Sequence, residues 1–306
     1  MLKHTARKRA AVLLAPLVWL VAGLALLASS LQGQASSSVP RDPHPIPALN
    51  VCEAVGPAFV HAGCRYTTAD PNADLKALVQ AYWKMDEFSD GSGAVTRADS
   101  GPNGLHLTDN NTVASGTGHV YTNAADVETD NSEYFSRASS APIQFGDVDW
   151  TLMQWVKFET INVGLGVALF GKENVAGTQI EVEGYINAAG LQPKLFVATG
   201  SGAAGTELVS SPAAVAGLWE LWFFWHDNAA NTINIQKNNG VPTSTALTVT
   251  PGTNAHGFAF GRLGERVGVY VAFDALLGPG AKFSAVLTSD QRLRLFNGGA
   301  GLALYP

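Results

Sequence analysis

Glu181 and Glu183 are the first residues of this 306-residue chain whose type and spacing could support catalysis. One residue separates them, so on a β-strand both carboxylates would project from the same face. Two carboxylates on one side of a glycosidic bond are what glycoside hydrolysis requires, one as acid and the other as nucleophile or base. This pair is therefore the feature that any prediction of an enzyme has to rest on.

Other catalytic and cofactor patterns are missing from the sequence. There is no G-x-S-x-G nucleophile motif, and the seven histidines are scattered without a metal-binding H-x-x-x-H. Residues 200–205 (GSGAAG) match G-x-G-x-x-G, but the segment that follows, TELVSSPAAV, does not continue as the helix of a βαβ unit. A surface loop explains these glycines, and no nucleotide site is predicted.

An aromatic stretch, LWELWFFWH over 218–226, offers binding chemistry instead. One face of this strand and its end supply the candidate ligand-binding residues Trp222, Phe224, His226, Asp227 and Asn228. A saccharide would use an aromatic face for its C–H surface and the polar groups for its hydroxyls. Because both faces of the stretch are apolar, the alternative is that these rings belong to the core of a central strand.

The N-terminus has the layout of an export signal. Four of the 19 basic residues lie in 1–9, and 10–28 is a run of 19 apolar residues without a charge. A basic end, an apolar stretch and small residues are typical of a secretory signal, while the length also suits an uncleaved membrane anchor. We expect 1–30 to be a signal peptide or an N-terminal anchor, and the protein to be secreted or extracytoplasmic. Any membrane contact is expected only through 10–28.

A Ser- and Pro-rich flexible linker is expected over 31–77. It contains the chain's two cysteines, Cys52 and Cys64, which in an exported protein most simply form a disulfide. Two free thiols are the alternative. A metal site with His61 lacks a fourth ligand.

Composition limits the class of partner. The chain is 46% hydrophobic, only 14% charged and has a formal net charge of −6. Since four cations are confined to 1–9, the remainder is more acidic still. Nucleic acid is excluded as a partner because its phosphates require a basic surface.

The elements that would position these residues are short strands separated by Gly, Asn, Asp and Ser. Candidate strands are 79–85, 151–158, 166–170, 179–186, 194–198, 218–226, 232–237, 257–262 and 267–273. Helices are expected only at 74–78 and at 289–296, where Thr288 is a suitable N-cap. Two long segments, 86–118 and 199–217, contain no predicted strand. The pattern predicts an all-β sandwich.

Short motifs follow one another in a recognisable order from about residue 80 to 306. They are AYWKMDE (81–87), DSGPNGLHL (99–107), NSEYFS (131–136), DWTLMQWVK (149–157), the run 219–225 with NTINI (231–235) and NNG (238–240), and LTSDQ (287–291) with LFNGGAG (295–301). Together they resemble the laminin G-like, concanavalin A-like jelly-roll domains. The resemblance implies an antiparallel jelly-roll β-sandwich over 78–306. The residues before it predict an N-terminal apolar helix followed by the flexible linker.

Calcium is the one ion that this resemblance makes a candidate. Its hard oxygen ligands would come from Asp86, Glu87, Asp99 and Asp274, at the meeting of the first and last strands. The alternative is that these acids cap turns or face solvent. Where relatives carry D-G-x-I-D-E-V, Asp274 is retained and the later acidic pair is replaced by Gly278 and Pro279, which implies a reduced or absent site.

The same family includes glucanases with an E-x-D-x-x-E motif, and this chain lacks the third acid after Glu181 and Glu183. We therefore predict no catalytic residues and no enzyme. The sequence favours an exported, non-catalytic carbohydrate-binding or adhesion module with a glycan partner. The alternative is a structural or protein-interaction module of an envelope or virion surface, whose partner is a surface protein.

Overall fold

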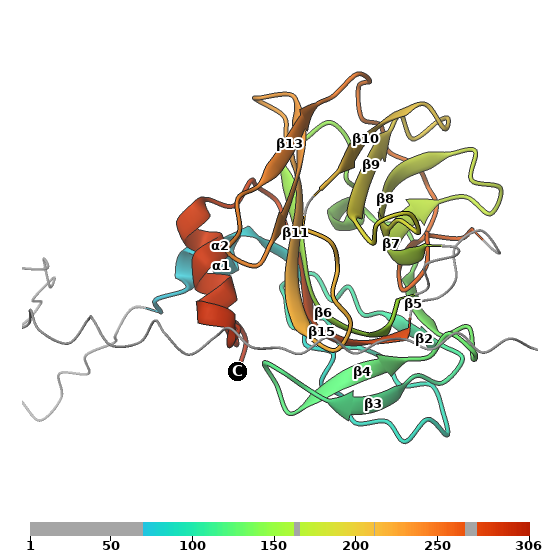
Figure 1. Ribbon diagram of the computed structural model, residues 1–306, viewed down its shortest axis with the longest axis vertical. Helices are drawn as coiled ribbons and strands as arrows, with labels where there is room; N and C mark the ends of the chain where they lie inside the picture. The colour runs from blue at the N-terminus through green and yellow to red at the C-terminus, as the bar shows by residue number, and fades with distance from the viewer. Residues whose placement is uncertain (1–69, 162–165, 211, 267–273) are drawn as a thin grey trace, which may run out of the picture. The chain divides into compact units, whose positions relative to one another are not determined.

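Two antiparallel β-sheets dominate the computed structural model (Figure 1), which describes residues 70–161, 166–210, 212–266 and 274–306. The first sheet has the order β13 (Thr243–Ala246), β12 (Thr232–Lys237), β11 (Trp219–Asp227), β6 (Trp150–Thr160), β15 (Asp274–Phe283), β4 (Asn123–Val127) and β3 (Ala114–Thr117), with β1 (Val79–Trp83) also paired to β15. The second has the order β10 (Gly205–Val209), β9 (Pro193–Ala198), β8 (Ile180–Ile186), β7 (Val167–Glu173), β14 (Phe258–Phe260), β5 (Tyr134–Arg137) and β2 (Thr108–Asn110). This arrangement confirms the predicted all-β antiparallel sandwich.

The main hydrophobic core lies between the two sheets. Trp83, Trp222 and Phe224 enter it from the first sheet, and Phe170 and Phe258 enter it from the second. The rings of Phe170 and Phe224 meet edge to face across the core, with centroids 5.0 Å apart. Burial of these large aromatic faces supplies much of the driving force that holds the sheets together.

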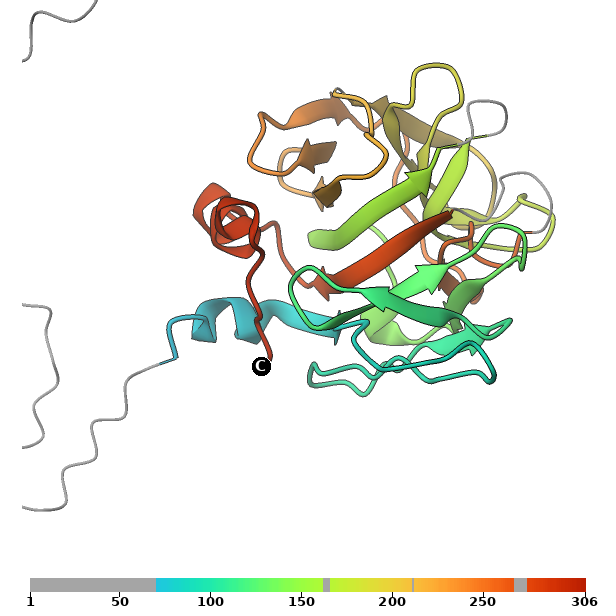
Figure 2. The same cartoon turned by 60° about the horizontal axis from the view of Figure 1, so that its bottom comes forward.

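A second core covers the other face of the first sheet. Helices α1 (Ala73–Leu78) and α2 (Ser289–Phe296) lie together on that side of the molecule (Figure 2). Leu75 and Leu295 of the helices share this cluster with Trp155 and Phe223 of the sheet. Two short 3₁₀ turns, η1 (Ala141–Ile143) and η2 (Asn297–Gly299), complete the elements.

Helix α2 begins where the sequence predicts. The Thr288 hydroxyl accepts a hydrogen bond from the Gln291 backbone N–H at 3.2 Å, and the Gln291 side chain accepts one from the Thr288 N–H at 2.9 Å. This reciprocal capping box satisfies two backbone donors that the helix cannot pair internally. The predicted Thr288 cap is confirmed.

Three strands lie in segments that were expected to contain none. Strands β2 and β3 fall within 86–118, and β10 falls within 199–217. Their sequences, TDN, ASGT and GTELV, have little apolar periodicity because β2, β3 and β10 stand at the ends of the sheets. End strands bury one side poorly, so the pattern on which strand prediction depends is weak there.

Strand β15 occupies the middle of the first sheet although its sequence contains Gly278-Pro279-Gly280. The register with β6 shifts between Leu277 and Gly280, so the proline lies in a β-bulge, where it does not interrupt the ladder. The Gln154 amide donates to the Gly278 carbonyl at 2.8 Å and closes this gap. The predicted strand 267–273 lies outside the described residues.

The compact unit that contains the sandwich includes helix α1, which precedes the predicted boundary at 78. Helix α1 belongs to it: Leu75 has no exposed surface, and the Asp74 carboxylate pairs with the Arg294 guanidinium of α2. Cys52, Cys64 and the segments 1–30 and 31–69 lie outside the described residues. Within those described, no helix is long and apolar enough to cross a bilayer.

Candidate functional site

A shallow pocket of about 240 Å³ lies on the second sheet, where β5 and β14 run side by side. Its lining residues are Tyr134, Ser136, Arg137, Ala138, Gly257, Phe258, Arg262, Gly264 and Glu265. The residues that line this small cavity therefore include two arginines, a tyrosine, a serine and a glutamate. A concave site with a few polar groups that converge on it is the usual form of a small-ligand site.

Strand alternation brings β5 to this pocket. Phe135 is fully buried in the main core, whereas its neighbours Tyr134 and Ser136 project from the opposite face and are only partly buried. The antiparallel register places Arg137 opposite Phe258 of β14, so the Arg137 side chain is on the same face of β5 as Phe135. One wall of the pocket thus belongs to a strand that the main core holds in place.

The other wall is the loop over 261–266, in which the Arg262 side chain hydrogen-bonds to the backbone of its own loop. Its Nε donates to the Arg266 carbonyl and its Nη2 to the Glu265 carbonyl, both at 2.7 Å. The guanidinium also lies over the Tyr134 ring, 4.6 Å from its centroid. Leu263 is buried beneath the loop in a small cluster with Tyr185. The wall is therefore preorganised.

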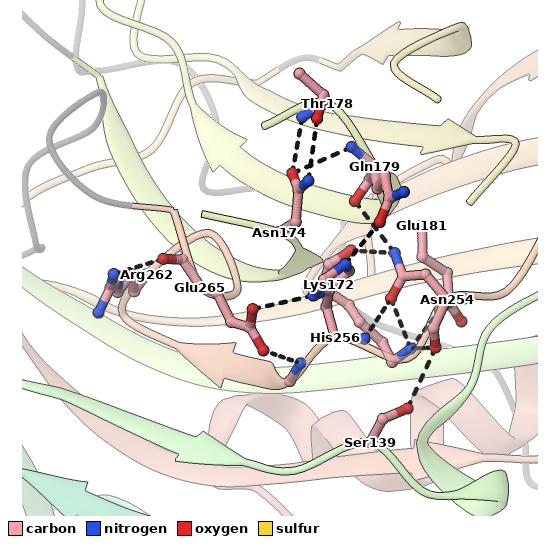
Figure 3. Close-up of polar contacts among 11 residues, drawn as sticks. Ser139, Lys172, Asn174, Thr178, Gln179, Glu181, Asn254, His256, Arg262 and Glu265 are labelled. Carbon is pink, nitrogen blue, oxygen red and sulfur yellow. Dashed lines mark hydrogen bonds and ion pairs between the residues drawn. The ribbon is translucent and has the colours of Figure 1, made fainter. Parts of the chain in front are cut away.

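The Glu265 carboxylate is turned towards His256 (Figure 3). His256 Nδ1 lies 3.0 Å from Glu265 Oε2, and the Gly257 N–H donates to Oε1 at 2.9 Å. His256 Nε2 lies 2.8 Å from the side-chain oxygen of Gln179. Both carboxylate oxygens are therefore occupied.

Behind the pocket, Lys172 and Glu181 form a fully buried ion pair at 2.5 Å (Figure 3). The lysine also donates to the backbone carbonyl of Asn254 at 2.7 Å, and the Asn254 N–H donates to Glu181 Oε2 at 2.9 Å. Burial lowers the pKa of Lys172, while the negative charge of Glu181 opposes that shift. With each charge paired and hydrogen-bonded, this cluster ties the segment that precedes His256 to the sheet.

Lys282 approaches the same glutamate from the first sheet. It is 4% exposed, and its Nζ lies 5.2 Å from the centroid of the Phe145 ring. Burial lowers its pKa to about 8, an effect that the charge of Glu181 partly offsets. Glu181 thus balances lysines from both sheets, which is a structural role.

A β-bulge explains why Glu181 points inwards. In the pairing of β7 with β8, Lys172 of β7 lies opposite Val182 of β8, and the next residue of β7, Glu173, lies opposite Ile180. Glu181 of β8 therefore has no partner in the ladder and is the inserted residue of the bulge. A bulge re-aims the side chain that it inserts. Glu181 therefore contacts Lys172, whereas Glu183 contacts Glu173. The expectation that Glu181 and Glu183 share a face is wrong.

Glu173 and Glu183 form a second carboxyl pair, across β7 and β8. Glu173 is fully buried and Glu183 is 5% exposed. Burial, followed by the charge of Glu183, raises the pKa of Glu173 to about 9, and burial raises that of Glu183 as well. Arg266 Nη1 lies 3.7 Å from one carboxylate and 3.8 Å from the other. A protonated Glu173 that donates to an ionised Glu183, beside Arg266, accounts for the arrangement.

A third group of acids lies in the first sheet, at one end of the adjacent strands β6, β15 and β4. Carboxylate oxygens of Asp126, Glu128 and Glu159 come within 4.8 Å of one another. Burial raises the pKa of all three, and the charge of nearby Asp274 adds to each shift. Oxygen ligands of this kind suit a hard cation such as Ca²⁺.

The four acids predicted as calcium ligands do not form a cluster. Asp99 accepts hydrogen bonds from the backbone N–H groups of Tyr82 and Leu105, at 2.8 and 2.7 Å. Glu87 accepts one from the Ala98 N–H at 2.6 Å. These two acids organise the turn after β1, as the alternative prediction held.

Asp274 lies far from that turn. Asp99 forms a β-bridge with Trp83 of β1, and Trp83 pairs with Gly280 of β15. Asp274, the first residue of β15, lies six residues before Gly280. At about 3.3 Å per residue, that offset is on the order of 20 Å. Asp86 contributes its backbone carbonyl, which accepts from the Asn123 amide at 3.0 Å.

The predicted aromatic platform is also corrected. Trp222, Phe224 and His226 have no exposed surface, because alternate residues of β11 face the core between the sheets. Trp225, on the other face, is 5% exposed and belongs to the second core. Among the described tryptophans only Trp219 is not buried, and the His119 imidazole stacks on it at 5.4 Å.

Asp227 and Asn228 belong to the turn that follows β11. The Asp227 carboxylate accepts from the Ala230 N–H, and the Asn228 N–H donates to Asp149, both at 2.8 Å. They are not brought to the pocket. The pocket residues carry no sequence signal of their own except the alternation of YFSR in β5.

No protein-family model matches the chain, and no curated protein sequence is significantly similar to it. Solved structures with a similar fold include the binding domain of Paraclostridial Mosquitocidal Protein 1 (TM-score 0.59, 13% identity, 74% of this chain and 53% of that chain). Another is a structure of botulinum neurotoxin type C, whose cell entry is dependent upon interaction with two ganglioside molecules (TM-score 0.57, 9% identity, 74% and 52%). A third is the binding domain of botulinum neurotoxin serotype D (TM-score 0.53, 9% identity, 73% and 52%). The chain spans about half of each, and at such identities the similarity shows the fold alone.

Proposed function

We propose that this chain is an exported, non-catalytic carbohydrate-binding module. The observation that carries the proposal is the pocket between β5 and the loop over 261–266, in which aromatic, hydroxyl and charged groups converge on a cavity of about 240 Å³. This volume is below the roughly 300–1,000 Å³ of pockets that enclose drug-sized ligands. It suits one sugar residue, bound at the surface of a rigid sheet.

Two further observations support the proposal. The motifs that resemble laminin G-like domains and the similarity to toxin binding domains point to the same class of module. In the second sheet the carboxyl groups of Glu173, Glu181 and Glu183 are buried. Lys172 holds Glu181 and Arg266 lies beside the other two, so none of the three is presented to a substrate. Export is supported by the apolar segment 10–28.

A glycan array tests this function. It is probed with the full-length protein, which is kept in a detergent without a sugar headgroup. Ala138 is exposed at the pocket, so Ala138→Trp should fill the cavity and abolish binding while the melting temperature is kept. Ala229→Trp is the matched control, because Ala229 is equally exposed in the turn between β11 and β12. An array on which the wild-type protein is silent would overturn the proposal.

A further inference from the structure

We propose that two neighbouring turns at one end of the sandwich form an apolar tip that inserts into the surface of a lipid bilayer. The apolar tip consists of the segment over 215–218 (VAGL) and the turn over 239–242 (NGVP). The proposal is independent of the pocket, and it goes beyond the membrane contact expected through 10–28. The observation that carries it is a run of exposed apolar residues, which a water-facing surface does not keep without a function.

The side chains of the apolar tip are strongly exposed. All four residues over 215–218 are exposed, and the exposed fractions of Leu218 and Val241 are 58% and 88%. Eight large hydrophobic side chains are exposed in the described part of the chain, and four of them lie in the tip or at the end of β10 that leads to it: Val209, Val215, Leu218 and Val241. Such a concentration marks a surface that contacts a protein or a membrane.

The two parts of the tip lie at the same end of one β-hairpin. The segment over 215–218 leads into β11, and the turn over 239–242 follows β12, the strand that pairs with β11. Lys237, the last residue of β12, connects them: its ammonium group donates to the Ala213 carbonyl at 2.8 Å and pairs with the Glu220 carboxylate of β11. The charges nearest to the tip therefore neutralise each other.

Backbone contacts hold the segment before β11 in its exposed position. The Gly217 N–H donates to the Phe158 carbonyl and the Ala214 N–H to the Leu191 carbonyl, both at 2.7 Å. Ala214 itself is buried in the main core. Gly217 has a φ of +79°, and a Cβ at this position would meet no atom within 4 Å. The fold therefore imposes the exposure, and the turn projects from the surface.

The composition of the tip favours a lipid surface over a protein partner. The sequences 208–219 (LVSSPAAVAGLW) and 238–249 (NNGVPTSTALTV) contain no charged residue, although 14% of the chain is charged. Tyr, Phe, Met and Arg, which are enriched in protein interfaces, occur in neither sequence. Small aliphatic side chains on projecting turns, with the half-buried Trp219 directly behind them, suit the boundary between lipid headgroups and acyl chains.

Photolabelling from the lipid tests the inference with the full-length protein. The protein is reconstituted with phosphatidylcholine vesicles that contain an analogue with a diazirine in its acyl chain, and after irradiation the labelled peptides are mapped by mass spectrometry. We expect 215–218 and 239–242 to carry at least tenfold more label than 228–231, the turn at the opposite end of the same hairpin. Equal labelling of the two ends, or no label on either, would overturn the inference.

Two further outcomes would assign the tip to another partner. A tip that stays unlabelled and instead crosslinks to a second copy of the chain would place it in a dimer interface. Label that appears only with anionic vesicles and disappears at about 0.5 M salt would assign the contact to charges. Either result overturns the proposal.

Variants then assign the contact to single side chains. Leu218→Gln and Val241→Gln should each lower the label on the tip about tenfold, because removing one aliphatic side chain from water contributes about that factor. Val148→Gln is the matched control, since Val148 is 55% exposed and directly precedes β6 at the opposite end of the sheet. Should both tip variants keep the wild-type label at an unchanged melting temperature, the assignment is wrong; should either fail to fold, the wild-type labelling pattern decides.

Discussion

At the scale of single residues, burial decides the charge of the Glu173–Glu183 pair. Two ionised carboxylates cannot share a buried site at low cost, so one of them retains a proton. The pKa of Glu173, raised to about 9 from 4.5, means that the folded protein keeps this proton where the unfolded chain releases it. The native state therefore loses stability as the pH rises from about 4.5 towards 9, and the contribution is fully present below that window.

Glu173→Gln should remove this dependence. The amide keeps a donor for Glu183 and does not ionise, so the variant should melt above the wild-type protein at pH 9 and close to it at pH 5. Thermal melts across this range measure the difference. Asp74→Asn is a control of opposite sign: hydrogen bonds from Arg294 and Gln291 lower the Asp74 pKa, so its contribution to stability is present throughout pH 5–9 and the variant should melt below the wild-type protein at every pH in that range. Parallel curves for wild type and Glu173→Gln would contradict the protonated pair.

The same scale explains why the pocket could not be predicted from the sequence. Tyr134 and Arg262 are far apart along the chain, and they come into contact only because β5 pairs with β14, which leads into the loop of Arg262. Neither residue belongs to a motif whose spacing indicates binding. Glu181 shows the converse: its spacing from Glu183 predicts a shared face, and one bulge residue reverses that prediction.

At the scale of elements, the sequence of β11 fits two interpretations, a buried core strand and an exposed ligand-binding face. Alternating aromatic residues predict a strand, and β11 confirms it, but the sequence does not say which face is covered. In the structure both faces are covered, since Phe223 and Trp225 pack in the second core and Trp222 and Phe224 in the first. The ligand-binding alternative failed because Trp222 and Phe224 face the second sheet across the main core, while helices α1 and α2 cover the other face of β11.

Trp222→Ala should therefore act on stability. Deleting a fully buried indole leaves a cavity and should cost about 3–5 kcal/mol of unfolding free energy. The fraction that remains folded should bind glycans with wild-type affinity, because Trp222 does not line the pocket. Chemical denaturation with a binding assay on the folded fraction measures both quantities. Lost binding at an unchanged stability would return Trp222 to the ligand site.

At the scale of the whole molecule, the sandwich was predictable because it follows from many weak, consistent patterns. Nine candidate strands and a capped helix agree with one fold class, so an error at a single strand, such as β10, does not change the result. The placement of charges has no such redundancy. Three carboxylates of Asp126, Glu128 and Glu159 converge only because β4, β6 and β15 lie side by side.

This convergence gives the last prediction, which concerns calcium. Burial and the charge of Asp274 raise the pKa values of the three acids, so their ionised forms oppose folding at neutral pH. A cation that binds the folded state would relieve the repulsion and raise the melting temperature. We expect millimolar Ca²⁺ to raise the wild-type midpoint relative to chelator. Glu159→Gln should raise the midpoint in chelator and remove the response to Ca²⁺, whereas Glu87→Gln, at the turn after β1, should keep that response. Identical wild-type midpoints in calcium and in chelator would exclude a calcium site at these three acids, because an ion that binds only the folded state must stabilise it.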